Sequence, residues 1–276
     1  MGKREICRKR VDALWCDRTA LEVYLIQGSG IPVPRTNLDL AAAVADAFGA
    51  KAAEPSAWER AVSWSSIDAS LAPANSPSEF LPYCAVQGMG AMRGGINADV
   101  VQVLTATIGR AASDDRWRLR DASAMALQRV GEGNLALLRN VCETWMQGDS
   151  PLQMRAVSVA LAHPPLLANP ELGLFALSAM DRAMDLYAAQ PRSTRALEPW
   201  LVLRKALEFV PSVCVAALPR DGFAMLQRWA SSSDPDVRKL VVANARKTRL
   251  AGKFADDVEA IGQALAWSAD DGFTDQ

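Results

Sequence analysis

Apolar side chains recur along this chain at helical spacing, and short turns separate the segments that carry them. At about 100° per residue, Leu119, Ala122, Ala126 and Val130 share one face of a helix. Proline, glycine and capping residues divide the rest of the chain in the same way. We expect helices at residues 5–27, 38–48, 55–66, 77–94 and 97–112, with Asn97 as a cap, and helix pairs from there to about residue 266. The pattern therefore predicts an all-α chain.

One of these helix starts has a specific signature. Ser76-Pro77-Ser78-Glu79 has the form of a capping box, with proline at the first helical position. In a capping box the serine hydroxyl accepts a hydrogen bond from the backbone N–H of the glutamate, and the glutamate carboxylate accepts one from the backbone N–H of the serine. We therefore expect Ser76 to be the N-cap of the helix that follows.

Glycines and tryptophans mark expected packing positions. The glycine-rich run that begins at Gly88 follows a helix rather than a strand, so we expect its Met and Ala residues to permit close helix packing, and then a turn, instead of a dinucleotide site. Trp145 and Trp229 end the helices that precede two of the turns described next, and we expect them to pack between helical units. Trp200, next to Pro199, is expected to pack at a helix kink.

The second half of the chain resembles itself at a fixed interval. Asp114 precedes Arg120 by six residues, Asp149 precedes Arg155 by six residues, and the two copies are 35 residues apart. Further copies contain Arg204 and Arg238, which are 34 residues apart. The longer interval between Arg155 and Arg204 indicates an insertion around residues 169–195. A period of this length with two helices per unit is typical of a stacked α-solenoid.

The segment Asp234-Pro-Asp-Val-Arg238 resembles the HEAT-repeat class, in particular its bacterial HEAT-like branch, in which the second helix of each pair commonly begins with Asp and then Val-Arg. The resemblance covers residues 97–163 and 200–266. It implies a right-handed α-α superhelix of about twelve helices. We expect one α-solenoid domain over residues 1–276, with an irregular helical part at 1–95, HEAT-like repeats at 97–266 and a flexible acidic tail at 268–276.

The chain offers few residues for metal or acid–base chemistry. His163 is the only histidine and two prolines follow it, so a helix-capping or surface role is expected. The five cysteines include no Cys-x-x-Cys pair, and phosphate-loop and nucleophile-elbow motifs are absent. We therefore expect no cofactor and no metal. Because no secretory signal and no long apolar run is present, we expect a cytoplasmic protein without a membrane partner.

Basic side chains could line one face of the repeats, although 30 basic against 31 acidic residues argue against a protein coated in positive charge. The helical wheel places Arg155 and Arg238 opposite the apolar face. The ladder so defined comprises Arg116, Arg120, Arg155, Arg204, Lys205, Arg238 and Lys239. Two interpretations stay open: the arginines could pair with the recurring aspartates and hold the turns, or they could form a groove for phosphates or an acidic peptide.

The segment from Asp236 to Lys253 favours the second interpretation, because it contains six basic residues against one acidic residue. Helix-pair solenoids commonly bind an extended partner on their concave face. The function that we expect is therefore a non-enzymatic scaffold that holds a protein or peptide on that face, and nucleic acid is a possible partner.

An alternative function follows from Trp117 and Asp121, which are one helical turn apart. The pair resembles the small bacterial HEAT-like DNA glycosylases that excise alkylated bases. That resemblance implies that Trp117 stacks on the nucleotide, Asp121 supplies a carboxylate that stabilises the cationic sugar, and Arg155 meets a phosphate. This chemistry needs neither histidine nor metal.

Overall fold

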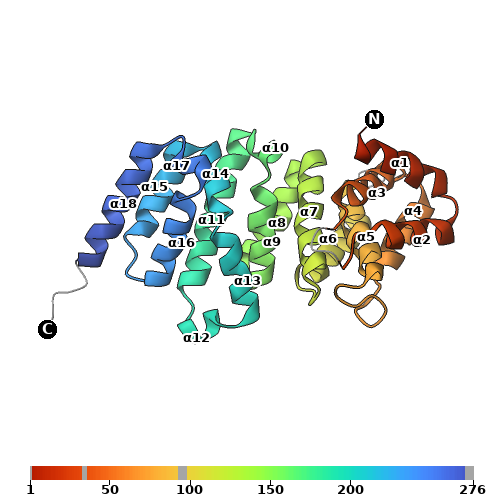
Figure 1. Cartoon of the computed structure of the whole chain (residues 1–276), viewed down its shortest axis with the longest axis horizontal. Helices are drawn as coiled ribbons and strands as arrows, with labels where there is room; N and C mark the ends of the chain where they lie inside the picture. The colour runs from red at the N-terminus through yellow and green to blue at the C-terminus, as the bar shows by residue number, and fades with distance from the viewer. Residues whose placement is uncertain (1, 33–35, 93–97, 271–276) are drawn as a thin grey trace. The chain divides into compact units, whose positions relative to one another are not determined.

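The structure, a computed structural model, describes residues 2–32, 36–92 and 98–270, and no side chain after residue 266 (Figure 1). Over these residues the chain consists of helices α1 to α18 and one 3-10 segment, without a strand, so the all-α prediction is confirmed. There are more helical segments than the twelve or so expected, partly because α10, α12 and α17 are single turns. Asn97 and the tail residues 271–276 lie outside the described residues.

The chain divides into two compact units, residues 1–141 and 142–276, which are described separately here. The first contains α1 (Lys3–Leu14), α2 (Arg18–Gly28), α3 (Leu38–Ala50), α4 (Pro55–Ser65), the 3-10 segment (Pro77–Glu79), α5 (Phe80–Ala91), α6 (Ala98–Ala112) and α7 (Trp117–Gly133). Helix α8 (Leu135–Gln147) spans the boundary.

The second unit contains α9 (Pro151–Leu161), α10 (Pro164–Leu167), α11 (Pro170–Ala188), α12 (Arg192–Arg195), α13 (Glu198–Leu207), α14 (Pro211–Ala217), α15 (Pro219–Ala230), α16 (Pro235–Ala245), α17 (Thr248–Ala251) and α18 (Ala255–Asp270). Proline occupies one of the first helical positions in most of them, where its missing N–H costs no hydrogen bond.

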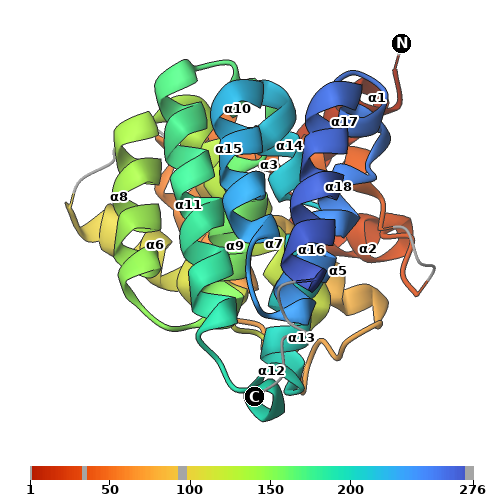
Figure 2. The same cartoon turned by 90° about the vertical axis from the view of Figure 1, so that its left-hand side faces the viewer.

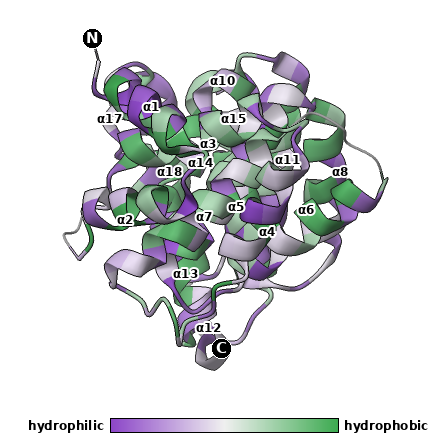
Figure 3. Cartoon of the chain, turned by 90° about the vertical axis from the view of Figure 1, so that its right-hand side faces the viewer, coloured by the Kyte–Doolittle hydropathy of each residue, from purple (hydrophilic) through white to green (hydrophobic). Residues whose placement is uncertain are grey.

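Helix α5 is the centre of the first unit. Every residue from Phe80 to Gly90 is buried, and α3 and α7 pack against it, as do α2 and α4. Since α1 also packs on α3, helices two apart in the chain lie side by side, as stacked helix pairs would place them. The superhelix expected for the whole chain stays a prediction. By contrast, α1 buries only Val11 and is largely hydrophilic along its length (Figure 3).

Two glycines let the neighbours of α5 approach closely, where the sequence predicts close helix packing. A Cβ atom at Gly88 would collide with the ring of Phe48 in α3, and one at Gly90 would lie 2.7 Å from the Cα of Ala126 in α7. The backbones of α5 and α7 are therefore in direct contact at Gly90. The Phe48 ring in turn meets the edges of Trp15 and Trp64, with ring centroids 5.1 and 5.9 Å away.

An acidic residue ties both ends of this unit to α3. Asp46 accepts from Arg4 of α1 at 2.6 Å and from Arg129 of α7 at 3.2 Å. One carboxylate thus joins three helices.

The expected helix over residues 5–27 is wrong in one respect, because it is two helices. Helix α1 ends at Leu14 and α2 begins after Asp17, whose carboxylate accepts a hydrogen bond from the backbone N–H of Ala20 at 2.9 Å. The break lets the Trp15 side chain turn inward, where it is 4% exposed. No proline or glycine marks this interruption in the sequence.

The predicted capping box is also wrong. Ser76 makes no side-chain capping bond, and residues Pro77–Glu79 form a 3-10 turn. The Glu79 carboxylate is fully buried and accepts from the backbone N–H of Asn75 at 2.9 Å and from the Arg118 guanidinium at 3.1 Å. The backbone N–H of Ser76, which the capping motif would pair with Glu79, donates instead to the carbonyl of Pro73 at 3.0 Å.

Helix α11 is central in the second unit. It packs against α9, α13, α14 and α15, and its first turn is capped by Asn169, whose side chain accepts from the backbone N–H groups of Glu171 and Leu172. Helices α11, α15 and α18 run side by side (Figure 2). Trp200 is buried, as expected, but Pro199 lies at the start of α13 and causes no kink.

We expect Gly90→Ala to destabilise the chain by about 1–3 kcal/mol, because the new methyl group must displace the backbone of α7. Urea unfolding followed by far-UV circular dichroism measures the change.

Gly262→Ala is the matched control, since it lies in α18 and a Cβ atom there meets nothing within 4 Å. It should be neutral or stabilising because alanine favours helix over glycine. Equal effects of the two substitutions would contradict the close approach of α5 and α7.

Candidate functional site

The basic ladder is divided between buried and exposed positions. Arg116 is 4% exposed, and its guanidinium donates to the Asp114 carboxylate at 2.7 and 2.9 Å and to the carbonyls of Ile67 and Ala72 at 3.0 and 3.1 Å. Arg120, at 8% exposed, is also buried. The Arg116 side chain therefore holds a turn of the first unit and presents no free donor surface to a partner.

Some ladder residues of the second unit form hydrogen bonds or ion pairs with other residues of the chain. Arg238 donates to the Ser232 carbonyl at 3.0 Å, which is a turn contact. Arg204 and Lys239 are exposed, and each is 3.1 Å from a carboxylate of its own helix, Glu208 and Asp236 respectively. Arg155 is half-buried on α9, and Lys205 is exposed on α13. The contacts of Arg116 and Arg238 are those of the first interpretation, in which arginines hold turns.

The sequence analysis missed a further arginine that holds a turn. Arg195 is 6% exposed, donates to the carbonyls of Ala188 and Gln190 at the end of α11, and lies 2.6 Å from Asp234, the N-cap of α16. Burial alone would raise the pKa of Asp234, but the hydrogen bond from Arg195, the backbone hydrogen bonds at the start of α16 and the charge of Arg195 together lower it below its ordinary value. The Arg195 guanidinium therefore binds carbonyl groups at the end of α11 and contacts the N-cap residue of α16.

A carboxylate with a lowered folded-state pKa stabilises the fold above its unfolded pKa, near 3.9, and this contribution is lost as the pH falls. We expect Asp234→Asn to lower stability at pH 7 by on the order of 1 kcal/mol, while asparagine keeps the N-cap bond. The difference from the parent chain should shrink between about pH 5 and pH 3, as measured by urea unfolding.

Asp149→Asn is the control, because that carboxylate has an 88% exposed side chain and lies 3.6 Å from Arg182. It should change stability little at any of these pH values. A pH dependence that is identical for all three chains would mean that the pair of Asp234 and Arg195 contributes nothing.

The structure places Trp117 and Asp121 on the first turns of α7. The Trp117 side chain is 40% exposed, and the guanidinium of Arg118 lies 4.2 Å from its ring centroid. Asp121 is half-buried near Tyr83, whose pKa is raised mainly by burial, with further contributions from Cys84 and Asp121. Neither Trp117 nor Asp121 lines either of the two cavities described below.

His163 is at the N-cap of α10, as expected from its prolines, although its side chain makes no capping bond. Among the described residues, no group of three or more His, Cys, Asp or Glu side chains could hold a metal ion. No helix in this part of the chain is long and apolar enough to cross a membrane.

Trp145 is buried, and the indole N–H of Trp229 donates to Asp181 in α11 at 2.7 Å.

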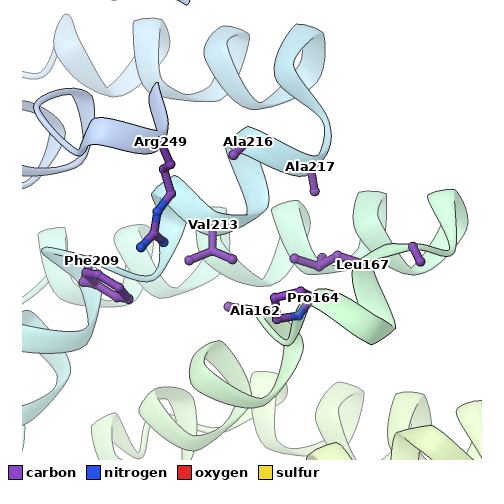
Figure 4. Close-up of a pocket in the computed structure, with 9 residues that line it drawn as sticks. Ala162, Pro164, Leu167, Phe209, Val213, Ala216, Ala217 and Arg249 are labelled. Carbon is purple, nitrogen blue, oxygen red and sulfur yellow. The ribbon is translucent and has the colours of Figure 1, made fainter. Parts of the chain in front are cut away.

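A cavity in the second unit has a volume of about 640 Å³ (Figure 4). Three parts of the chain form its walls: the single-turn helix α10 with the residues beside it, α14 with the segment that leads into it, and α17. Eight of the nine lining residues are apolar and the ninth is a cation: Ala162, Pro164, Leu167, Ala168, Phe209, Val213, Ala216, Ala217 and Arg249. The Arg249 side chain extends toward the space between Phe209 and Val213.

Two cations meet one aromatic ring at the edge of this pocket. The Arg249 guanidinium lies 4.4 Å from the centroid of the Phe209 ring and the Lys247 ammonium 5.3 Å from it, and Phe209 is 47% exposed. Each contact is a cation–π interaction. Within the described part of the chain, no carboxylate forms an ion pair with Arg249 or Lys247, in contrast to Arg204 and Lys239. We call this feature the basic edge, defined by Lys247, Arg249 and Phe209.

The second cavity, of about 280 Å³ in the first unit, has a balanced charge. Its lining includes Arg110 and Arg116 but also Asp68 and Asp114. Because Arg116 is already bound to Asp114, this cavity offers less uncompensated charge than the basic edge.

No protein-family model, curated protein or solved structure matches the chain, so its site must be judged on its own geometry. The basic excess between Asp236 and Lys253 pointed to the cations of the basic edge, including Lys247 and Arg249. The apolar pocket was missed, because its walls come from residues 162–168, residues 209–217 and Arg249, which lie far apart along the chain, and no pattern within one segment signals it.

Proposed function

We propose that this chain is a non-enzymatic binding protein that holds a peptide segment of a partner protein in the pocket of its second unit. An apolar side chain of the peptide enters the pocket, and an acidic side chain next to it contacts Arg249 and Lys247. The observation that carries the proposal is the pairing of an apolar cavity with two cations that have no carboxylate partner among the described residues.

The lining supports binding rather than catalysis. The nine side chains include no carboxylate, hydroxyl, thiol or imidazole that could act as a base or nucleophile. A volume of about 640 Å³ is within the range of ligand pockets and holds several peptide side chains. Apolar burial would supply affinity, while the guanidinium would select for an anionic neighbour.

The proposal retains the HEAT-like solenoid as the expected architecture. The residues that line the pocket all fall within residues 97–266, the expected repeats. A polyanion such as DNA is the competing occupant of the basic edge, since Arg246 and Lys253 are exposed in the same segment. DNA would make no use of the apolar pocket.

The test compares four fluorescein-labelled nine-residue peptides, each with a central Leu or Ser flanked by Asp or by Lys residues. Fluorescence anisotropy should detect binding of the Leu peptide with Asp flanks only, because that peptide alone satisfies both the pocket and the basic edge. Arg249→Ala should weaken this binding about tenfold, equivalent to the loss of one charge-assisted contact.

Arg246→Ala is the matched control, since it removes an exposed arginine of the same segment that does not line the pocket. Ala216→Phe should abolish binding by filling the pocket, and far-UV circular dichroism checks that this variant folds. Binding of a short DNA duplex that falls steeply with salt, without binding of any peptide, would replace the proposal with the polyanion alternative.

A further inference from the structure

The chain itself contains a segment with the chemistry of the proposed ligand. Residues 268–276 read Ser-Ala-Asp-Asp-Gly-Phe-Thr-Asp-Gln, with Phe273 between Asp271 and Asp275 and with no basic residue. An aromatic side chain flanked by carboxylates complements an apolar pocket whose edge holds two cations without a described carboxylate partner. The segment thus matches both the apolar cavity and the cations at its edge.

We propose that residues 268–276 of one copy of the chain occupy the pocket of a second copy, with Phe273 in the cavity and the flanking carboxylates on Arg249 and Lys247. This inference rests on the proposed function, because it names the peptide that the same pocket binds. It identifies the partner as a second copy of this chain.

The geometry of α18 directs the segment to another copy. Helix α18 begins at Ala255, soon after α17, and packs against α17, α16 and α15. Its 16 residues lead away from α17, which carries Arg249, over about 24 Å at 1.5 Å per residue (Figure 1). Phe273 follows Asp270 by three residues, which span at most about 11 Å when extended.

An extended segment of that length cannot return along α18 to the pocket of its own chain. The contact between copies is therefore heterologous, because the segment of one copy meets a different surface, the pocket, of the next. Such contacts do not close on themselves unless a rotation brings the last copy back to the first. We expect association that grows with concentration.

Two single variants with complementary defects test the arrangement. Phe273→Ser removes the anchor but leaves the pocket intact, and Arg249→Ala weakens the pocket but leaves the segment intact. Light scattering after size-exclusion chromatography should show a mass that rises with concentration for the parent chain. Each variant alone should require an at least tenfold higher concentration to associate.

A mixture of the two variants restores one complete contact, since the pocket of the Phe273→Ser chain can accept the segment of the Arg249→Ala chain. We expect the mixture to form a one-to-one dimer and no larger species. A mixture that stays monomeric would overturn the inference, as would a parent chain that stays monomeric at ten times the dissociation constant measured for the free peptide.

The free peptide 268–276 provides the second readout, titrated by anisotropy onto the Phe273→Ser chain. It should bind, and the same peptide with Ser in place of Phe273 should bind at least tenfold more weakly. Arg246→Ala, introduced into the Phe273→Ser chain, should leave the affinity unchanged.

The outcomes also separate this inference from the proposed function. If the designed Leu peptide with Asp flanks binds while peptide 268–276 does not, the inference fails and the proposed function stands. If neither peptide binds, both fail. Binding of peptide 268–276 that is unaffected by Arg249→Ala and by Ala216→Phe would place it elsewhere on the chain and overturn the inference.

Discussion

The burial of a complete helix governs the first unit. A helix that is covered on every side, as α5 is from Phe80 to Gly90, needs neighbours that approach from several directions. Interaxial spacing depends on the side chains at the contact, so glycine at the crossing points sets how close α3 and α7 can come. Gly88 accommodates the Phe48 ring, and Gly90 accommodates the backbone of α7. The positions of the outer helices follow from these two approaches.

Arginine has two opposite roles in this chain, and the second unit contains both. At Arg116 and Arg195 the guanidinium is buried and its donors are distributed between an aspartate and two backbone carbonyls. Such residues satisfy polar groups that would otherwise be left without partners near helix ends. Arg249 is half-exposed and lies against an aromatic ring beside an apolar cavity. A charge in that position remains available to an anion.

The sequence predicted the helices well where local chemistry marks their ends. The helix start at Pro55 agrees with the structure, because proline has a defined place in the first turn of a helix. The break at Asp17 escaped prediction, since an aspartate in an amphipathic run can lie on the helix surface or act as an N-cap. The capping box does not form: the Ser76 N–H donates to the Pro73 carbonyl, and the Glu79 carboxylate binds the Asn75 N–H and Arg118, which is 39 residues away.

The candidate site was also predictable only in part, because contacts between residues far apart in the sequence define it. A helical wheel indicates the face on which an arginine lies, but not whether a carbonyl from another turn reaches it, and this distinction separates Arg116 from Arg249. The apolar pocket depends on the packing of three distant segments, so its residues look like ordinary helix-face alanines and leucines. Only the local excess of basic residues was visible in advance.

The ion pairs of Asp46 bear on the order in which the first unit assembles. The partners Arg4 and Arg129 are 42 and 83 residues away along the chain. The contact with Arg4 can form as soon as α1 and α3 have met, whereas the contact with Arg129 requires the intervening helices to be folded, because bringing distant residues together costs chain entropy. A chain that ends before α7 therefore lacks one of the two cationic partners of the Asp46 carboxylate.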